Sequence, residues 1–164
     1  MGRKNAFLLV LLVVMVLFLL WLKPSLPAGR GSLSVTATYT GLGAVDGHHK
    51  IYVLLTDSNP FTPAQLIQTN SQSPAVEVGT AHVLACKRLE TNGSVTFQNI
   101  PVSPVYAVAF FDKNGTYDGP PRTLPPGTPM GVRGPLPDKW EPVKVEVGKT
   151  AQITLAFDDS IATP

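Results

Sequence analysis

From residue 31 onward, much of the chain alternates between apolar and polar positions, a pattern typical of half-buried β-strands. In segment 33–39 the odd positions are leucine, valine, alanine and tyrosine, and the positions between them are serine or threonine. Segments 50–56 and 105–111 are apolar on both faces, so we expect them at the centres of sheets. Seven strands are predicted in all, at 33–39, 50–56, 80–90, 94–100, 105–111, 143–147 and 151–157.

Turn residues between these segments predict how the strands connect. Asn92-Gly93 is a strong β-hairpin signal, so strands 80–90 and 94–100 are expected to pair. Gly148-Lys149 predicts a second hairpin, between 143–147 and 151–157. One short helical turn is expected in 62–68, which has a threonine followed by a proline at its start. The pattern therefore predicts an all-β domain, a seven-stranded antiparallel β-sandwich of prealbumin-like or immunoglobulin-like type.

Residues 6–22 form an uninterrupted apolar segment without charge or helix breaker. As a helix they would measure roughly 25 Å, the short end of a membrane span. Arg3 and Lys4 precede the segment, so its N-terminus is expected in the cytoplasm and the rest of the chain outside. The alternative is a cleaved signal peptide, which would release the domain into the periplasm or the medium. The segment exceeds the ~7–15 residues usual for a signal peptide, and Leu26 stands where a cleavage site needs a small residue.

This division gives an anchor or signal peptide at 1–28, predicted as one hydrophobic helix, and a β-sandwich domain at 29–164. Arg3, Lys4 and Lys23 account for three of the 13 basic residues, which leaves 10 against 11 acidic residues in the domain. The domain therefore has no basic excess that would favour nucleic acid binding. Its single cysteine, Cys86, excludes a disulfide framework and is expected to be a small buried side chain.

The segment "VTFQNIPVSPVYAVAFFDKNG", residues 95–115, resembles a pattern in transthyretin-like and carboxypeptidase-regulatory-like domains. In those domains a strand ending in Phe-x-x-Leu-Pro is followed by a short turn and Tyr-x-Val, roles that Phe97, Ile100, Pro101, Tyr106 and Val108 would take. The acidic loop that follows is similar to one in a bacterial family of uncharacterised exported domains. Pro104 stands near the family's glycine, and the loop is shorter. The resemblance implies a non-catalytic exported β-sandwich module.

Four oxygen-bearing side chains follow the apolar strand at 105–111, at alternate positions: Asp112, Asn114, Thr116 and Asp118. A curled loop with this spacing can direct several oxygens at one hard cation, so the sequence offers a candidate calcium site. A full calcium shell needs about six to eight oxygens, and the next acidic residue is as far away as Asp138. The alternative is a turn in which aspartate and asparagine bond their own backbone. No other metal or cofactor is expected.

The connection 112–142 is long for a compact domain and contains eight prolines. Proline-rich segments are stiff without regular structure, so this one is a candidate contact surface for a protein or glycan partner, with Tyr117, Met130 and Trp140 as contact points. The alternative is that the segment lies over one sheet, with Trp140 packed against it.

No recognised catalytic motif occurs in the chain, and the paired histidines at 48–49 are expected to be solvated loop residues. We therefore expect a membrane-anchored extracytoplasmic β-sandwich with a binding or structural role. A calcium-stabilised ligand-binding or carbohydrate-binding module is the alternative, and an enzyme is the weaker one.

Overall fold

The computed structural model describes residues 30–60, 76–77, 81–101, 103–119, 123–134 and 140–163. The predicted anchor at 6–22 and the helical turn predicted in 62–68 lie outside these residues. Within the described ranges there is no α-helix, and no helix that is long and apolar enough to cross a membrane. The described part of the chain is all-β, as predicted.

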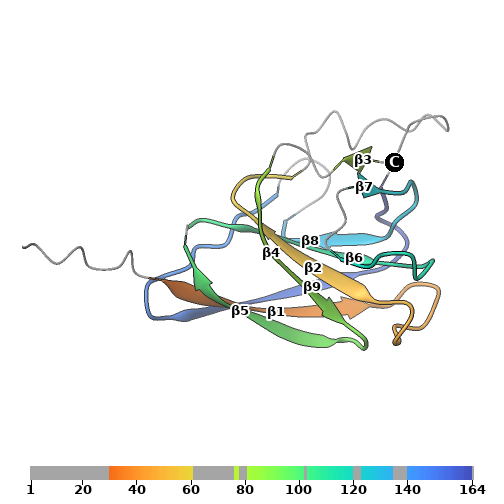
Figure 1. The fold of residues 1–164 in the computed structure, drawn as a ribbon, viewed down its shortest axis with the longest axis horizontal. Helices are drawn as coiled ribbons and strands as arrows, with labels where there is room; N and C mark the ends of the chain where they lie inside the picture. The colour runs from red at the N-terminus through yellow and green to blue at the C-terminus, as the bar shows by residue number, and fades with distance from the viewer. Residues whose placement is uncertain are drawn as a thin grey trace, which may run out of the picture.

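Two sheets pack face to face and hold seven strands between them (Figure 1). The first sheet, in the order β5-β1-β9, consists of Gly93–Ile100, Gly31–Tyr39 and Thr150–Phe157. The second, in the order β4-β2-β6-β8, consists of Val83–Leu89, Ile51–Thr56, Tyr106–Phe111 and Met130–Val132. A separate two-stranded ladder joins β3, Val76–Glu77, to β7, Thr123–Leu124. The two apolar strands, β2 and β6, occupy the interior positions of the second sheet, as their sequences predicted.

The main core lies between the two sheets, and alternate residues of each strand point into it. In β1 these are the odd-numbered residues, which are all buried, whereas the serines and threonines between them are half-buried. The Tyr39 ring stacks on Phe111 of the other sheet at 4.1 Å and contacts Phe157 at 5.4 Å. The period-two pattern of β1 therefore directly reflects its position over this core.

A second apolar cluster covers the outer face of the four-stranded sheet. It contains the even-numbered residues of β2 and β6, which explains why these strands are apolar on both faces. Leu124, Met130 and Trp140, from the proline-rich connection, complete the cluster: the first two are fully buried and Trp140 is 8% exposed. The described part of this connection thus lies over one sheet with Trp140 packed against it, which was the alternative to an exposed contact surface.

The hairpin predicted at Asn92-Gly93 is wrong, because β4 and β5 belong to different sheets. The Asn92 side chain instead binds the end of β1: its amide oxygen accepts the Tyr39 N–H at 2.9 Å, and its amide nitrogen donates to the Tyr39 carbonyl at 3.1 Å. A tight turn can therefore connect two strands of one sheet or carry the chain from one sheet to the other, and Asn-Gly is compatible with both.

The second predicted hairpin is also wrong, since β9 pairs with β1, and in parallel orientation. The sandwich is therefore not wholly antiparallel. Segment 143–147 forms no strand; Val143 makes an isolated bridge with Val105, and the Val145 N–H donates to Ser103 Oγ at 2.9 Å. The seventh strand is β8, a short segment inside the connection that the sequence suggested would be irregular.

Candidate functional site

The loop that follows β6 is organised by the carboxylate of Asp112. This side chain is 3% exposed, and its two oxygens accept the backbone N–H groups of Asn114 at 3.2 Å and Tyr117 at 2.9 Å. Gly115, at a φ of 63°, lies in the left-handed region and donates to the Asp112 carbonyl at 3.4 Å. Asp112 thus forms the backbone-bonded turn that was the alternative to a calcium loop.

A second turn, at residues 125–128, faces this loop. Thr128 donates to the Pro125 carbonyl through both its N–H, at 3.2 Å, and its hydroxyl, at 2.7 Å. The C-terminal segment holds the turn from behind, because Thr163 accepts the Gly127 N–H on its carbonyl at 2.8 Å and the Thr128 N–H on its hydroxyl at 3.0 Å. The turn is therefore fixed at both of its ends.

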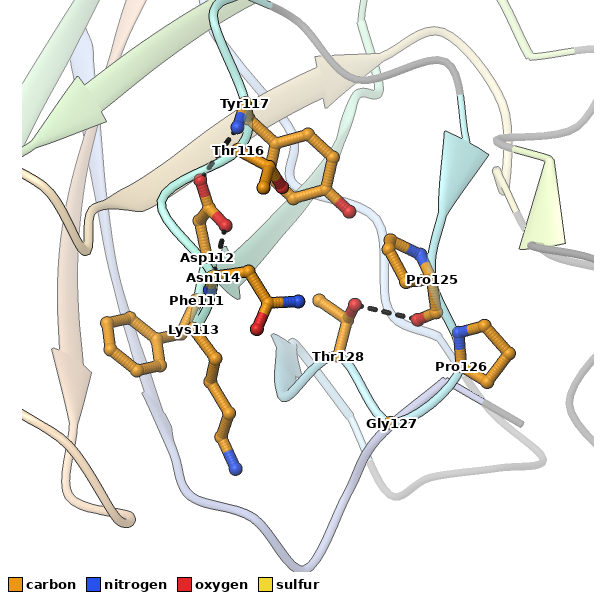
Figure 2. Close-up of a pocket in the computed structure, with 10 residues that line it drawn as sticks. All are labelled: Phe111, Asp112, Lys113, Asn114, Thr116, Tyr117, Pro125, Pro126, Gly127 and Thr128. Carbon is orange, nitrogen blue, oxygen red and sulfur yellow. Dashed lines mark hydrogen bonds between the residues drawn. The ribbon is translucent and has the colours of Figure 1, made fainter.

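Between the two loops lies a pocket of about 170 Å³ (Figure 2). Its lining residues come from the end of β6 and its loop and from the 125–128 turn: Phe111, Asp112, Lys113, Asn114, Thr116, Tyr117, Pro125, Pro126, Gly127 and Thr128. Figure 2 shows the Asn114 side chain directed from the first loop toward Thr128 of the second. The pocket thus combines amide and hydroxyl groups with the apolar rings of two prolines.

The charged groups of the pocket are satisfied within the protein. Asp112 is bound by backbone N–H groups, and Lys113 forms an ion pair with Asp159. Asp159 also accepts the Leu42 N–H at 2.6 Å and the Tyr39 hydroxyl at 2.9 Å. The Leu42 N–H and the Lys113 side chain lower the pKa of Asp159 to about 2. The polar groups left to meet a ligand are therefore uncharged.

Tyr117 contributes a buried hydroxyl to the wall of the pocket. Its ring packs edge-on against Phe110 at 5.8 Å and Tyr52 at 5.9 Å, and its carbonyl accepts the Tyr52 hydroxyl at 2.5 Å. Burial raises the pKa of Tyr117, and the neighbouring Thr128 side chain lowers it by a smaller amount. The Tyr117 hydroxyl is closed off from solvent, and the Thr128 hydroxyl is its polar neighbour. Tyr117 therefore shapes the wall of the pocket, and the polar side chains open to a ligand are those of the exposed Asn114 and Thr116.

The structure brings together three of the four residues proposed as metal ligands. Asp112, Asn114 and Thr116 line the pocket, whereas Asp118 is exposed and is not among its lining residues. The described ranges contain no group of three or more histidine, cysteine, aspartate or glutamate side chains that could hold a metal ion. The calcium site stays a prediction, and the backbone bonds of Asp112 leave each of its oxygens one further lone pair.

The three proposed partner contacts have different positions. Tyr117 lines the pocket, but Met130 is fully buried and Trp140 is nearly so, both in the second apolar cluster. The sequence showed apolar side chains in a long loop, but it did not show that they lie against the outer face of β2 and β6. Met130 and Trp140 are therefore packing residues of this fold and form no exposed contact surface.

The paired histidines and the single cysteine that the sequence singled out lie outside the pocket. Asp46 accepts the N–H groups of His48 at 2.8 Å and His49 at 2.7 Å, and the His49 ring lies 3.1 Å from the same oxygen, in one loop. Cys86 is half-buried on β4, and burial raises the pKa of its thiol to about 11.

The pocket residues that the sequence analysis missed are those of the 125–128 turn. Its Pro-Pro-Gly signal was visible, but nothing indicated that it faces the Asp112 loop.

Comparisons with known proteins give a limited result. No protein-family model matches the chain, and no curated protein matches it. Among solved structures, an alternative pilotin from the type II secretion system of Vibrio cholerae aligns with a TM-score of 0.41 at 14% identity, over 79% of this chain and 96% of the pilotin. A pilus-presented adhesin, Spy0125 (Cpa), aligns with a TM-score of 0.31 at 12% identity, over 84% of this chain and 28% of the adhesin. The transthyretin-like family is not confirmed by these comparisons.

Proposed function

We propose that this chain is a membrane-anchored β-sandwich module on the outer side of a membrane, which binds an uncharged polar ligand in the pocket beside Asp112. Residues 6–22 supply the anchor, and the pocket supplies the binding site. The observation that carries the proposal is the pocket's chemistry. Its charges are neutralised by the protein itself, while the Asn114 amide and the hydroxyls of Thr116 and Thr128 line it.

The proposed ligand follows from the groups that face the pocket. A charged ligand would find no unpaired counter-charge there, because Asp112 and Lys113 are both engaged. The exposed Asn114 amide and Thr116 hydroxyl both donate and accept hydrogen bonds, as sugar hydroxyls do. At about 170 Å³ the pocket is smaller than the ~300–1,000 Å³ typical for drug-sized ligands, so it suits one residue of a longer molecule. A neutral glycan meets these conditions.

The proposal assigns a binding role, with no catalytic step and no nucleic acid partner. The calcium-stabilised version of the same module remains an alternative that the lining of the pocket does not favour. Only three of the four proposed ligands line it, and the described ranges contain no group of three or more histidine, cysteine, aspartate or glutamate side chains that could hold a metal ion. The transthyretin-like and carboxypeptidase-regulatory-like assignment also remains part of the proposal, supported by the motif at 97–108 and by the two-sheet architecture.

Saturation-transfer NMR tests the ligand assignment. The full-length chain, in a detergent without a sugar head group, is mixed in turn with glucose, N-acetylglucosamine and glucuronic acid. We expect saturation of a neutral sugar, and its loss in both Asn114→Ala and Thr116→Val, since each removes a polar pocket group without touching Asp112. Ser94→Ala, on the three-stranded sheet, is the matched control and should bind normally.

Two results would contradict the proposal. The first is the absence of saturation with both neutral sugars, and the second is an equal signal in wild type and both pocket variants. Preferential saturation of glucuronic acid would contradict the uncharged-ligand argument in particular. Proteolysis of intact cells that express the full chain tests the anchoring separately, because cleavage of the domain from outside is expected only if it lies beyond the membrane.

A further inference from the structure

The outer edge of β9 is open among the described residues. β9 pairs with β1 in continuous register from Thr150 to Phe157. The Ser32 N–H donates to the Lys149 carbonyl at 2.9 Å, and the Thr40 N–H donates to the Phe157 carbonyl at 3.0 Å. In a parallel pair this pattern turns the backbone groups of the odd-numbered residues of β9 toward β1.

The even-numbered residues of β9 therefore direct their N–H and C=O groups away from the sheet. These residues are Thr150, Gln152, Thr154 and Ala156. No described residue forms a hydrogen bond with their backbone groups, and their side chains are all exposed. This edge therefore offers a ladder of unpaired donors and acceptors for another strand.

The other edge strands carry features that discourage such pairing. On β5, the outward carbonyl of Thr96 accepts Lys87 Nζ at 2.7 Å. On β8, the C-terminal segment covers the edge, since the Met130 N–H donates to the Ile161 carbonyl at 2.9 Å. β4 carries two exposed cationic side chains, Lys87 and Arg88. Charged side chains and covering segments are the usual protection of a sheet edge, and the outer edge of β9 has neither within the described residues.

The charges at the two ends of β9 indicate which strand would fit. Lys149 forms an ion pair with Glu146 at 2.6 Å, so the segment that leads into β9 has a net charge of +1 from Lys144. Asp159 forms an ion pair with Lys113, so the segment that follows β9 has a net charge of −1 from Asp158. A second β9 in antiparallel orientation would place the basic start of each copy near the acidic end of the other. The outward residues between the ends are uncharged, so no like charges would face each other across the new ladder.

We propose that the outer edge of β9 is the interface of an antiparallel homodimer, in which two three-stranded sheets join into one six-stranded sheet. The proposal does not depend on the ligand-binding pocket, which lies at the end of β6. It uses the backbone groups of the four even-numbered residues, with complementary charges at both ends of the paired strands.

Sedimentation velocity of the full-length chain in a density-matched detergent measures the oligomeric state. We expect wild type to sediment with the protein mass of two chains, and Gln152→Pro with the mass of one. Proline at 152 removes an N–H that points outward, so the ladder with β1 is kept. Thr154→Lys, which places two like charges near the dimer axis, should act in the same way. Thr96→Lys is the matched control on the same sheet and should remain dimeric.

Charge reversal tests the antiparallel order. Lys149→Glu, which also breaks the ion pair with Glu146, should raise the dimer dissociation constant about threefold to tenfold, and adding Asp158→Lys should restore it, because the net charges at the two ends of the strand are again opposite. The proposal is overturned by a monomeric wild type at 100 µM chain, the highest concentration in the series. A dimer that persists in both Gln152→Pro and Thr154→Lys also overturns it and assigns the contact to another surface, such as residues 6–22. Failure of the double reversal to restore the dimer rejects the antiparallel arrangement.

Discussion

Replacement of Asp112 tests whether its carboxylate organises the pocket loop through the backbone. Asp112→Ala removes an acceptor that is 3% exposed and bonds two N–H groups, at 3.2 and 2.9 Å. A hydrogen bond to a charged group contributes about 1.5–3 kcal/mol. The Asn114 N–H is at an exposed residue where water can replace the lost acceptor, so it takes the low end of this range. Tyr117 is half-buried, so its N–H takes the higher end.

The expected loss of unfolding free energy for Asp112→Ala is therefore about 3–4 kcal/mol, or ~6–16 °C in Tm for a chain of this size. Asp112→Asn keeps one acceptor oxygen but turns an NH₂ group toward the second N–H. It should lose about 2 kcal/mol, intermediate between wild type and alanine. This graded order distinguishes backbone bonding from a general requirement for a polar side chain.

Urea unfolding of the full-length chain in detergent, followed by Trp140 fluorescence in a Trp21→Phe background, measures these differences. Trp140 lies in the buried cluster on the outer face of the four-stranded sheet, so its emission reports the folded state. Each variant is measured with millimolar calcium and with chelator. A change within about 0.5 kcal/mol for Asp112→Ala would refute the backbone argument. A calcium-dependent rise in the wild-type free energy of unfolding that Asp112→Ala abolishes would assign the carboxylate to a cation as well.

Two further predictions concern close packing and acid stability. Gly131→Ala should lower the free energy of unfolding by about 1–3 kcal/mol in the same urea assay. The reason is that a Cβ at residue 131 would lie 2.7 Å from Phe157 Cδ1 and 2.9 Å from Phe157 Cβ. Unchanged stability would show that the Phe157 side chain moves freely. The pKa of Asp159 is lowered to about 2 from an ordinary 3.8, so its stabilisation is present above pH ~4 and is lost as the pH falls toward 2. Asp159→Asn should therefore lose less stability than wild type between pH 4 and 2, measured by Tm against pH, and parallel curves would contradict this reasoning.

The sequence predicted strand positions well because burial on one face leaves a period-two pattern. β1, with its strict alternation, and β2 and β6, with apolar residues on both faces, all lie where their patterns indicated. Which strands pair with each other was harder to predict. Asn92-Gly93 has the composition of a hairpin, yet its role in bonding both backbone groups of Tyr39 depends on the distant end of β1. Strand pairing is a long-range property that local turn chemistry does not determine.

The candidate site was predictable only on one side. The oxygen-bearing residues after β6 were identified from their spacing, and Asp112 lies at the centre of that loop. The opposite wall at 125–128 lies close to it only because β8 returns antiparallel to β6, with the Phe111 N–H donating to the Pro129 carbonyl at 3.0 Å. A three-residue strand such as β8 has too few positions to show a period, so its sequence gave no strand signal.

The position of β1 between β5 and β9 has a consequence for biogenesis. This first strand gains its antiparallel neighbour only after residue 100 has been synthesised, and its parallel neighbour only after residue 157. Until then its backbone donors and acceptors have only water as a partner, and the inner surface it shares with Phe157 is incomplete. Such non-local closure is slow and leaves nascent chains prone to aggregation, so we expect β1 to be the segment most exposed to mispairing during synthesis.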